Sequence, residues 1–282
     1  MNLPIIDTHI HTWDFTKAEY DWLKGDVSIL NRAYHVSEIN EARKMAGVTE
    51  GVLVQAANNK EDTSWMLDVA ANTDWITGVV GWLPLMDPQA TEAGLLLYKN
   101  NPWFKGVRHL IHNEPEVTWL LQDEVLESLS LLAQNNLSYD VVGVSADHLK
   151  SAILVAEKIP GLRMVFNHLN QPPIASKQQF GEWGALMQEA AAHKNCYAKI
   201  SGLGTTANNS AWQEEDIKPY ILFALENFGT SRCFVGGDWP VSLLAGSYTH
   251  TWNAYRNILE SLLQDNQLQD VYSNNAKEFY RL

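Results

Sequence analysis

The sequence predicts a single (β/α)8 TIM barrel that comprises residues 1–282. Eight short apolar runs alternate with segments of helical periodicity, a pattern typical of right-handed βαβ units around a parallel sheet. The length suits one such barrel, and no Ser/Gly/Pro-rich linker, charge block or repeat divides the chain. The competing fold is an open doubly wound sheet. Its glycine-rich phosphate loop is missing, because Asp7, Thr8 and His9 follow the first apolar pair.

The expected strands are runs rich in β-branched and apolar residues that end in polar residues. They begin at Ile5, Gly51, Ile76, Gly106, Tyr139, Met164, Tyr197 and Cys233. Between them, apolar residues that recur every three or four positions predict helices over residues 37–46, 61–71, 125–133, 146–159, 180–192 and 214–228. Gly47, Pro160 and Gly229 follow three of these segments and are typical helix terminators.

The composition favours an enzyme that acts on a small molecule. The chain carries 20 basic and 33 acidic residues, and its net charge of −13 repels nucleic acid at long range. The longest apolar runs are far shorter than the ~18 residues that cross a bilayer, so no membrane partner is expected. The first residues lack the features of a secretory signal, and Cys196 and Cys233 have no metal-binding spacing. We therefore expect a reduced cytoplasmic enzyme, and the sequence leaves a homo-oligomer open.

A long connection of about 40 residues separates the first two strands, more than one helix requires. Its first part, residues 13–34, contains the aromatic residues Trp13, Phe15, Tyr20, Trp22 and Tyr34. A segment that follows the first strand lies at the barrel mouth, where it can wall or cover a ligand site. The alternative is a flap packed on the outer helices. We expect this segment and the loop 113–122 to set substrate specificity.

The first strand ends in a histidine pair with the spacing of a chelating site. Side chains alternate along a strand, so His9 and His11 point the same way, about 7 Å apart at Cα. Both imidazoles can therefore reach one metal ion at ~2.0–2.1 Å. The spacing alone is a weak signal, because about 0.3 such pairs are expected by chance among nine histidines. The position of the pair at the end of a barrel strand is the stronger evidence for a metal-binding role.

Two further ionisable residues follow expected strands. His168 ends the sixth strand and Asp238 ends the eighth, and the carboxyl ends of barrel strands are where this fold places catalytic groups. With His9 and His11, they would bind one divalent ion and leave a position open for water. The alternative roles are structural: His168 bonding a loop carbonyl, and Asp238 capping the helix after Pro240.

The motifs IIDTHIHTWD, GVRHLIHNEP, NHLNQP, YAKISGL and GGDWPV occur in this order and cover nearly the whole chain. Together they resemble the amidohydrolase superfamily, and more narrowly its group of sugar-acid lactonases, such as L-rhamnonolactonase and L-fuconolactonase. A more distant relative is 2-pyrone-4,6-dicarboxylate lactonase. The resemblance implies that His9 and His11 are the first-strand metal pair, that His168 is the sixth-strand histidine, and that Asp238 takes the proton from the attacking water.

The resemblance also bears on the metal. Arg108 and His109 stand where binuclear members carry a carboxylated lysine, and Tyr139 and Asp140 follow without a fifth-strand histidine. Two metals are therefore not expected. One divalent ion, with zinc as the expected identity, fits the remaining residues. The similarity to metal-independent lactonases leaves activity without a metal open.

Several other residues are candidates to bind the substrate. Arg108 carries a forked cation suited to a substrate carboxylate or an oxyanion, or else it forms an ion pair that braces the barrel. Its neighbour His109 should face away from the barrel axis. Lys199 should point inward, toward substrate oxygens or toward a core acid, and Tyr139 is a candidate hydrogen-bond donor. Trp13, Trp82 and Trp239 adjoin strand ends and are candidates to stack on a sugar ring.

The expected reaction is hydrolysis of a small sugar-derived lactone, an aldonolactone such as fucono- or rhamnonolactone. Asp238 would act as the base and His168 would assist it at the reacting centre. One alternative is a metal-dependent decarboxylase of the same superfamily, which also uses a first-strand histidine pair and a last-strand aspartate. The other is a binding protein without catalysis, which the intact set of site residues argues against.

Overall fold

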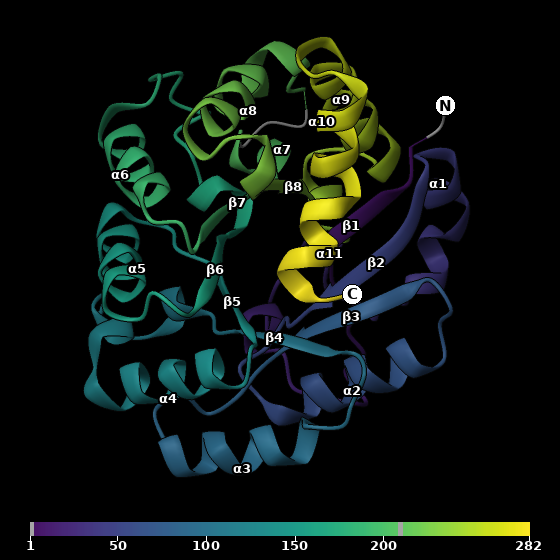
Figure 1. Ribbon diagram of the computed structural model, residues 1–282. Helices are drawn as coiled ribbons and strands as arrows, with labels where there is room; N and C mark the ends of the chain where they lie inside the picture. The colour runs from purple at the N-terminus through teal and green to yellow at the C-terminus, as the bar shows by residue number, and fades with distance from the viewer. Residues whose placement is uncertain (1–2, 208–210) are drawn as a thin grey trace.

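The computed structural model describes residues 3–207 and 211–282 and shows eight parallel strands paired in sequence order. The strands are β1 (Ile5–Ile10), β2 (Val48–Val54), β3 (Ile76–Gly81), β4 (Phe104–Arg108), β5 (Ser138–Val141), β6 (Arg163–Phe166), β7 (Cys196–Ile200) and β8 (Cys233–Val235). The segment after β8 returns to β1, where Trp239 O accepts from His11 N at 2.7 Å and Asp238 N donates to His9 O at 2.7 Å. The predicted (β/α)8 barrel is confirmed, and Figure 1 shows its strands ringed by helices.

The helices of the described residues lie between and after the strands. They are α1 (Asn40–Met45), α2 (Lys60–Ala71), α3 (Pro88–Tyr98), α4 (Asp123–Gln134), α5 (Ala146–Lys158), α6 (Gly181–Ala192), α7 (Leu203–Thr206), α8 (Glu214–Phe228), α9 (Tyr248–Leu262), α10 (Asp265–Gln269) and α11 (Asn275–Tyr280). Local sequence explains several starts, because the side chains of Asn59, Ser145 and Ser247 cap backbone N–H groups at the amino ends of α2, α5 and α9. The predicted segment 37–46 is split, with a 3-10 turn over Val36–Ile39 before α1.

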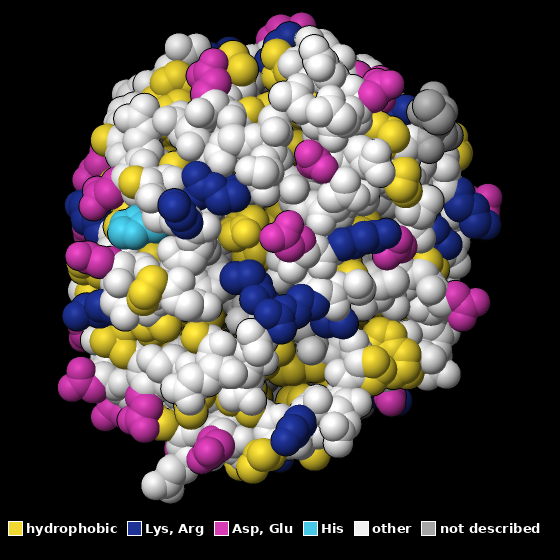
Figure 2. Space-filling model, viewed as in Figure 1, with side chains coloured by type: hydrophobic (Ala, Val, Ile, Leu, Met, Phe, Trp, Pro, Cys, Tyr) yellow, Lys and Arg dark blue, Asp and Glu magenta, His cyan; other side chains and the backbone are white. Residues whose placement is uncertain are grey.

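The amino-terminal end of the barrel is sealed by α11. Phe279 and Tyr280 pack into the barrel against inward-facing strand residues such as Ile6 and Phe234. Lys105 Nζ donates to the carbonyl of Arg281 at 2.8 Å, and so holds the chain end over the strands. Figure 1 shows α11 across the barrel on the side that faces the viewer, and Figure 2 shows Lys and Arg side chains gathered near the centre of this face. A ligand can therefore approach the barrel axis only from the opposite, carboxyl-terminal end.

The segment 13–34 packs tightly at that opposite end. Trp13 is fully buried, pairs with Tyr34 in an antiparallel bridge, and donates from Nε1 to the carbonyl of Arg32 at 2.6 Å. Tyr20 donates its hydroxyl hydrogen to Asp62 Oδ1 at 2.9 Å. The segment thus forms a fixed wall at the barrel mouth and is also packed on the outer helix α2. It combines the two roles expected for it, a wall of the ligand site and a flap on the outer helices.

Two expectations from composition can be compared with the structure. Cys196 and Cys233 are both buried free thiols, so they form no disulfide. Within residues 3–207 and 211–282, every helix is too short or too polar to cross a membrane.

Asp62 predicts a pH dependence of stability. Burial raises the pKa of Asp62 to about 6, although bonds from Ala56 N, Ala57 N and Tyr20 oppose this rise. Because an unfolded aspartate has a pKa of ~3.9, the folded state retains a proton that the unfolded state releases. The stabilisation is fully present below about pH 4 and is lost as the pH rises through about 6.

Asp62→Asn should remove this term, since an amide does not titrate; its oxygen can accept from Ala56 N and Ala57 N, and its nitrogen can donate to the Tyr20 hydroxyl. Between about pH 4.5 and about pH 7.5, wild type should lose about 2 kcal/mol more unfolding free energy than the variant. Urea unfolding of both proteins at the two pH values measures the difference. Parallel pH profiles would show that Asp62 is not the titrating group.

Candidate active site

A cavity of about 300 Å³ opens at the carboxyl ends of the strands. Its lining brings together four residues singled out in the sequence, namely His11, Arg108, His168 and Asp238. Neutral and apolar side chains complete the wall: Trp22, Ala56, Leu110, His112, Val142, Gln171, Thr205, Thr206 and Val241. The volume suits one small ligand rather than a polymer.

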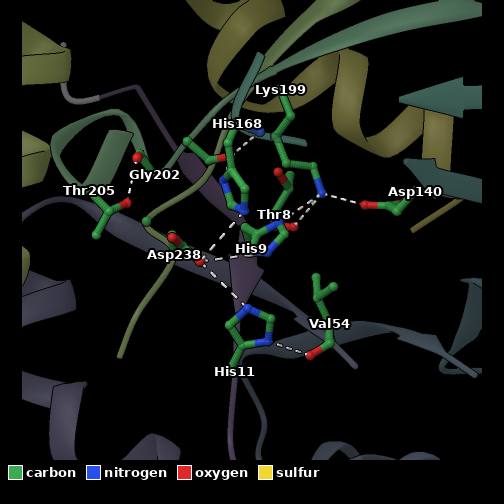
Figure 3. A network of polar contacts seen from close by, with 12 residues as sticks. Thr8, His9, His11, Val54, Asp140, His168, Lys199, Gly202, Thr205 and Asp238 are labelled. Carbon is green, nitrogen blue, oxygen red and sulfur yellow. Dashed lines mark hydrogen bonds and ion pairs between the residues drawn. The ribbon is translucent and has the colours of Figure 1, made fainter. Parts of the chain in front are cut away.

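The Asp238 carboxylate is the point where the site residues meet. Its Oδ1 lies 3.5 Å from His11 Nε2, 3.7 Å from His9 Nε2 and 3.9 Å from His168 Nε2. Figure 3 shows the three imidazoles converging on this oxygen from β1 and from the segment after β6. One nitrogen from each of His9 and His168 and one oxygen of Asp238 all lie within 4.8 Å of one another. This is the geometry of a group that can hold a metal ion.

The hydrogen bond between His11 Nδ1 and the carbonyl of Val54 fixes the tautomer of the His11 ring. His11 Nδ1 is 2.7 Å from the carbonyl of Val54, and a carbonyl only accepts, so Nδ1 carries the hydrogen. In the neutral ring, Nε2 then presents a lone pair toward Asp238 Oδ1. Two electron-rich atoms face each other at 3.5 Å, an arrangement that a proton or a cation between them would stabilise.

Two of these side chains, those of His168 and Asp238, are directed toward the cavity by a left-handed backbone conformation. The four residues 168–171 have φ between 50° and 56°, and Asp238 has φ 55°, a conformation that costs about 1–2 kcal/mol for each non-glycine residue. Side chains hold the strained turn: Ser201 Oγ accepts from His168 N at 3.2 Å, and Asn170 Oδ1 accepts from Gly143 N at 3.2 Å. Three of these residues, His168, Gln171 and Asp238, line the cavity.

Gly202 makes room for the same pair. Its φ is +59°, and a Cβ atom there would lie 2.6 Å from His168 Nδ1 and 2.8 Å from Asp238 Oδ2. Only glycine satisfies both the conformation and the space. His168 Nδ1 also lies 2.8 Å from Ser201 Oγ, which fixes the plane of the ring.

Burial keeps the three imidazoles neutral. It lowers the pKa of His168 to about 4, that of His9 well below its usual value, and that of His11 by a smaller shift that Asp238 opposes. For Asp238, burial alone would raise the pKa, but His168, His11 and Arg108 outweigh it and hold the pKa below its usual value. Near neutral pH the site therefore contains three neutral imidazoles and one ionised carboxylate.

Arg108 brings a permanent positive charge to the cavity wall. Its Nε donates to Gln55 Oε1 at 2.9 Å, its Nη2 donates to the carbonyl of Gln55 at 2.6 Å, and its Nη1 lies 3.4 Å from His9 Nε2. Burial lowers the pKa of Arg108 to about 10, so the guanidinium remains charged at neutral pH. Gln55 thus fixes the orientation of the cation while one nitrogen stays near the reacting centre.

Lys199 lies beneath the cavity rather than in its wall. It points inward, as predicted, and its Nζ donates to Asp140 Oδ2 at 2.6 Å and to the carbonyl of Thr8 at 3.0 Å. Both side chains of the pair are fully buried, and Tyr280 of α11 donates to the same carboxylate. Of the two roles that the sequence left open, the structure shows the pairing with a core acid. Lys199 Nζ also lies 3.4 Å from His9 Nδ1, so the pair supports that ring from below.

Four of the predicted substrate contacts do not reach the cavity. Tyr139 points outward into the cluster between strands and helices, because its neighbour Asp140 occupies the inward position on β5. Trp13 and Trp239 are buried against Tyr34, and Trp82 donates to His109 Nδ1 at 3.0 Å. In the structure these four side chains do not line the cavity, and their contact with a substrate stays a prediction.

Two supporting residues and one aromatic residue were missed. Gln55 and Ser201 directly follow β2 and β7, so the strand-end rule that selected His168 and Asp238 also applies to them. Trp22 is the tryptophan that lines the cavity, and it lies in the aromatic segment whose general role was expected. The direction of one aromatic side chain within a loop leaves no signal in the sequence.

A parallel barrel whose mouth holds histidines and an aspartate around one point defines the class: an enzyme of the amidohydrolase type. The chain belongs to the amidohydrolase family, whose model matches residues 6–282. The resemblance inferred from the sequence motifs is thereby confirmed.

Three relatives extend this result. The chain is 32% identical over 281 residues to the L-fucono-1,5-lactonase of Burkholderia ambifaria, covering 98% of this chain and 95% of that protein. It is 27% identical to the L-fucono-1,5-lactonase of Burkholderia multivorans, covering 98% and 96%. A crystal structure of a Burkholderia multivorans amidohydrolase with bound zinc superposes with a TM-score of 0.90 at 26% identity, covering 99% of both chains.

The Lys199–Asp140 pair predicts a strong energetic coupling. Lys199→Met should cost about 3–5 kcal/mol of unfolding free energy, because it leaves Asp140 buried without a cation. The double variant Lys199→Met/Asp140→Asn should be more stable than the sum of the single changes implies, by at least about 1 kcal/mol. Denaturant unfolding of the four proteins gives this coupling, and strictly additive changes would contradict the pair.

Proposed function

We propose that this protein hydrolyses a small sugar-derived lactone, an aldonolactone such as fucono- or rhamnonolactone. The observation that carries the proposal is the ionised Asp238 carboxylate, which lines the cavity beside neutral imidazoles and the Arg108 cation. Ester hydrolysis needs a base for water and a positive group for the carbonyl oxygen, and this cavity supplies both. The two relatives named as L-fucono-1,5-lactonases support a sugar lactone as the substrate.

A single zinc ion fits the residues around Asp238. Two ligands at ~2.0–2.1 Å from one zinc ion lie at most about 4.2 Å apart, and the nitrogens of His11, His9 and His168 lie 3.5–3.9 Å from Asp238 Oδ1. The lone pair of His11 Nε2 that faces the carboxylate also calls for a cation. A bound zinc would polarise the lactone carbonyl and lower the pKa of a water molecule. We infer that His9, His11, His168 and Asp238 hold it.

Asp238 performs the proton transfers. Its carboxylate accepts a proton from the attacking water as the new C–O bond forms at the lactone carbonyl. When the tetrahedral centre collapses, the bond to the ring oxygen breaks and Asp238 returns the proton to that oxygen. His168 Nε2 lies 3.9 Å from Asp238 Oδ1, so this ring would hold the metal beside the carboxylate that takes the proton. The product is the open-chain sugar acid.

Arg108 stabilises the negative charge that develops during the reaction. Gln55 holds the guanidinium in place through two hydrogen bonds, so no reorganisation is needed when the carbonyl oxygen becomes an oxyanion. The cavity wall near Arg108 is mostly neutral, which strengthens this interaction. Thr205 and Thr206 also line the cavity; their hydroxyls donate to the carbonyl of Gly202 at 2.6 Å and 3.1 Å, so their oxygens can accept hydrogen bonds from the substrate.

The decarboxylase alternative has less support. Two curated relatives with high coverage are named as lactonases, and the same four site residues serve water attack without further assumptions. A decarboxylase would release carbon dioxide, whereas a lactonase acidifies a weakly buffered solution.

Asp238→Asn should reduce kcat for lactone hydrolysis by about 10²–10⁴-fold, since it removes the base with little change of shape. A pH-indicator assay with aldonolactones measures the rate, and binding of a non-hydrolysable sugar lactam should change less than tenfold. Gln55→Ala should lower kcat by a smaller factor, because Arg108 keeps its charge but loses its fixed orientation. Wild-type turnover by Asp238→Asn would disprove the mechanism.

The metal proposal predicts about one zinc ion per chain in protein prepared without chelator. His11→Asn should lower the zinc content by at least tenfold, whereas His193→Asn, a change remote from the cavity, should retain it. Elemental analysis measures the metal. Full activity in zinc-free protein would overturn the metal's role, and would fit instead the metal-independent lactonases that the sequence also resembles.

A further inference from the structure

A second, larger cavity adjoins the first at the barrel mouth. It has a volume of about 890 Å³, and we call it the outer groove. Its lining comes from the segment 13–34, the loop after β2 and the loop after β4: Phe15, Thr16, Lys17, Ala18, Glu19, Asp21, Trp22, Ala57, Asn58, Asn59, Glu61, Leu110 and Asn113. Trp22 and Leu110 line both cavities. A ligand in the catalytic cavity can therefore continue past these two side chains into the outer groove.

Trp22 is held as a fixed surface between the two cavities. Its Nε1 donates to the carbonyl of Ala56 at 2.8 Å, and its ring meets Trp13 edge to face at 5.4 Å between centroids. The side chain still keeps 37% of its surface exposed. An aromatic face that is held rigidly but left partly exposed is suited to packing against the apolar face of a sugar ring.

The outer groove offers the mixture of groups that neutral sugars need. Phe15 exposes 46% of its surface, and Asn113 presents an amide group, whereas the amide of Asn59 caps α2 and donates to the carbonyl of Glu19. Asn58 is linked to the reacting centre, because its Oδ1 accepts from Gln55 Nε2 at 3.0 Å, and Gln55 in turn holds Arg108. The groove and the catalytic cavity thus share one rigid set of hydrogen bonds.

The charges around the outer groove favour a neutral occupant over an anionic one. Its lining includes three carboxylates, Glu19, Asp21 and Glu61, against one cation, Lys17. Lys24 pairs with Glu19 and Asp21 at 3.2 Å and 2.6 Å, and Lys60 Nζ lies 3.9 Å from Glu61 Oε1, so the groove is close to neutral and these lysines are already paired. A phosphate or carboxylate group would have to compete with these carboxylates for the lysines, whereas the carboxylates accept hydrogen bonds from the hydroxyls of a neutral sugar.

We propose that the outer groove binds a neutral glycosyl unit attached to the lactone ring, so that the substrates include disaccharide aldonolactones. This proposal rests on the proposed lactonase function and names its substrate class. The catalytic cavity of about 300 Å³ takes the lactone, and the groove of about 890 Å³ has room for a second ring. Trp22 lies at the junction of the two rings.

The test compares two 1,5-lactams that share the same ring, glucono-lactam and lactobiono-lactam, of which only the second carries a neutral galactosyl unit. Calorimetry with wild-type protein should show at least tenfold tighter binding of the disaccharide. Phe15→Ala should reduce this advantage by about three- to tenfold. The matched control Val27→Ala removes a side chain of the same segment that is 99% exposed, and should leave the advantage unchanged. A disaccharide lactam whose second ring is a uronic acid should bind more weakly than the neutral one.

Equal binding of the two lactams, absent binding of the disaccharide, or an advantage that Phe15→Ala leaves intact would overturn the proposal. Tighter binding of the uronic acid compound would overturn the assignment of a neutral occupant. Hydrolysis of the corresponding lactones is measured separately in the same protein. Tighter binding of the disaccharide lactam without any lactone hydrolysis would contradict the proposed function but support the ligand class of the outer groove. Lactone hydrolysis without tighter binding of the disaccharide lactam would support the proposed function but contradict the ligand class of the outer groove.

Discussion

A buried carboxylate at the barrel mouth sets the conditions for the rest of the site, because an ionised group that is only 3% exposed needs positive charge or donors near it. Asp238 has Arg108 on the cavity wall and three imidazole nitrogens at 3.5–3.9 Å. Burial keeps those imidazoles neutral, so they do not act as counter-ions and can serve as metal ligands. The strained backbone of His168 and Asp238 and the absent side chain of Gly202 hold this arrangement in place.

Much of the architecture could be predicted because it follows from periodicity. Apolar runs that alternate with helical segments predict a barrel, and the rule that barrel strands carry chemistry at their carboxyl ends selected His9, His11, His168 and Asp238 from three distant parts of the chain. The structure brings these four together around one oxygen atom. The inward position of Lys199 followed from the same reasoning, because the outer face of a barrel strand is covered by helices.

Other features could not be read from the sequence, for identifiable physical reasons. Neighbouring side chains on β5 alternate between the two faces of the barrel wall, so an error of one residue in the predicted position assigns a side chain to the wrong face. Tyr139 points outward and Asp140 points inward. Aromatic residues in a loop carry no directional signal, so Trp22, rather than Trp13 or Trp239, proved to line the cavity. The left-handed turn at 168–171 contains no glycine and depends on contacts with distant residues, which local sequence does not reveal.

The most direct test of this account is a crystal structure of the Asp238→Asn variant with a bound sugar lactam. The account predicts that the ring occupies the cavity lined by Arg108 and His168. The carbonyl carbon should lie within about 4 Å of the residue 238 side chain, and the carbonyl oxygen should face the guanidinium or a metal held by the histidines. A lactam bound elsewhere, with its carbonyl carbon more than about 8 Å from residue 238, would contradict the assignment of Asp238 as the base.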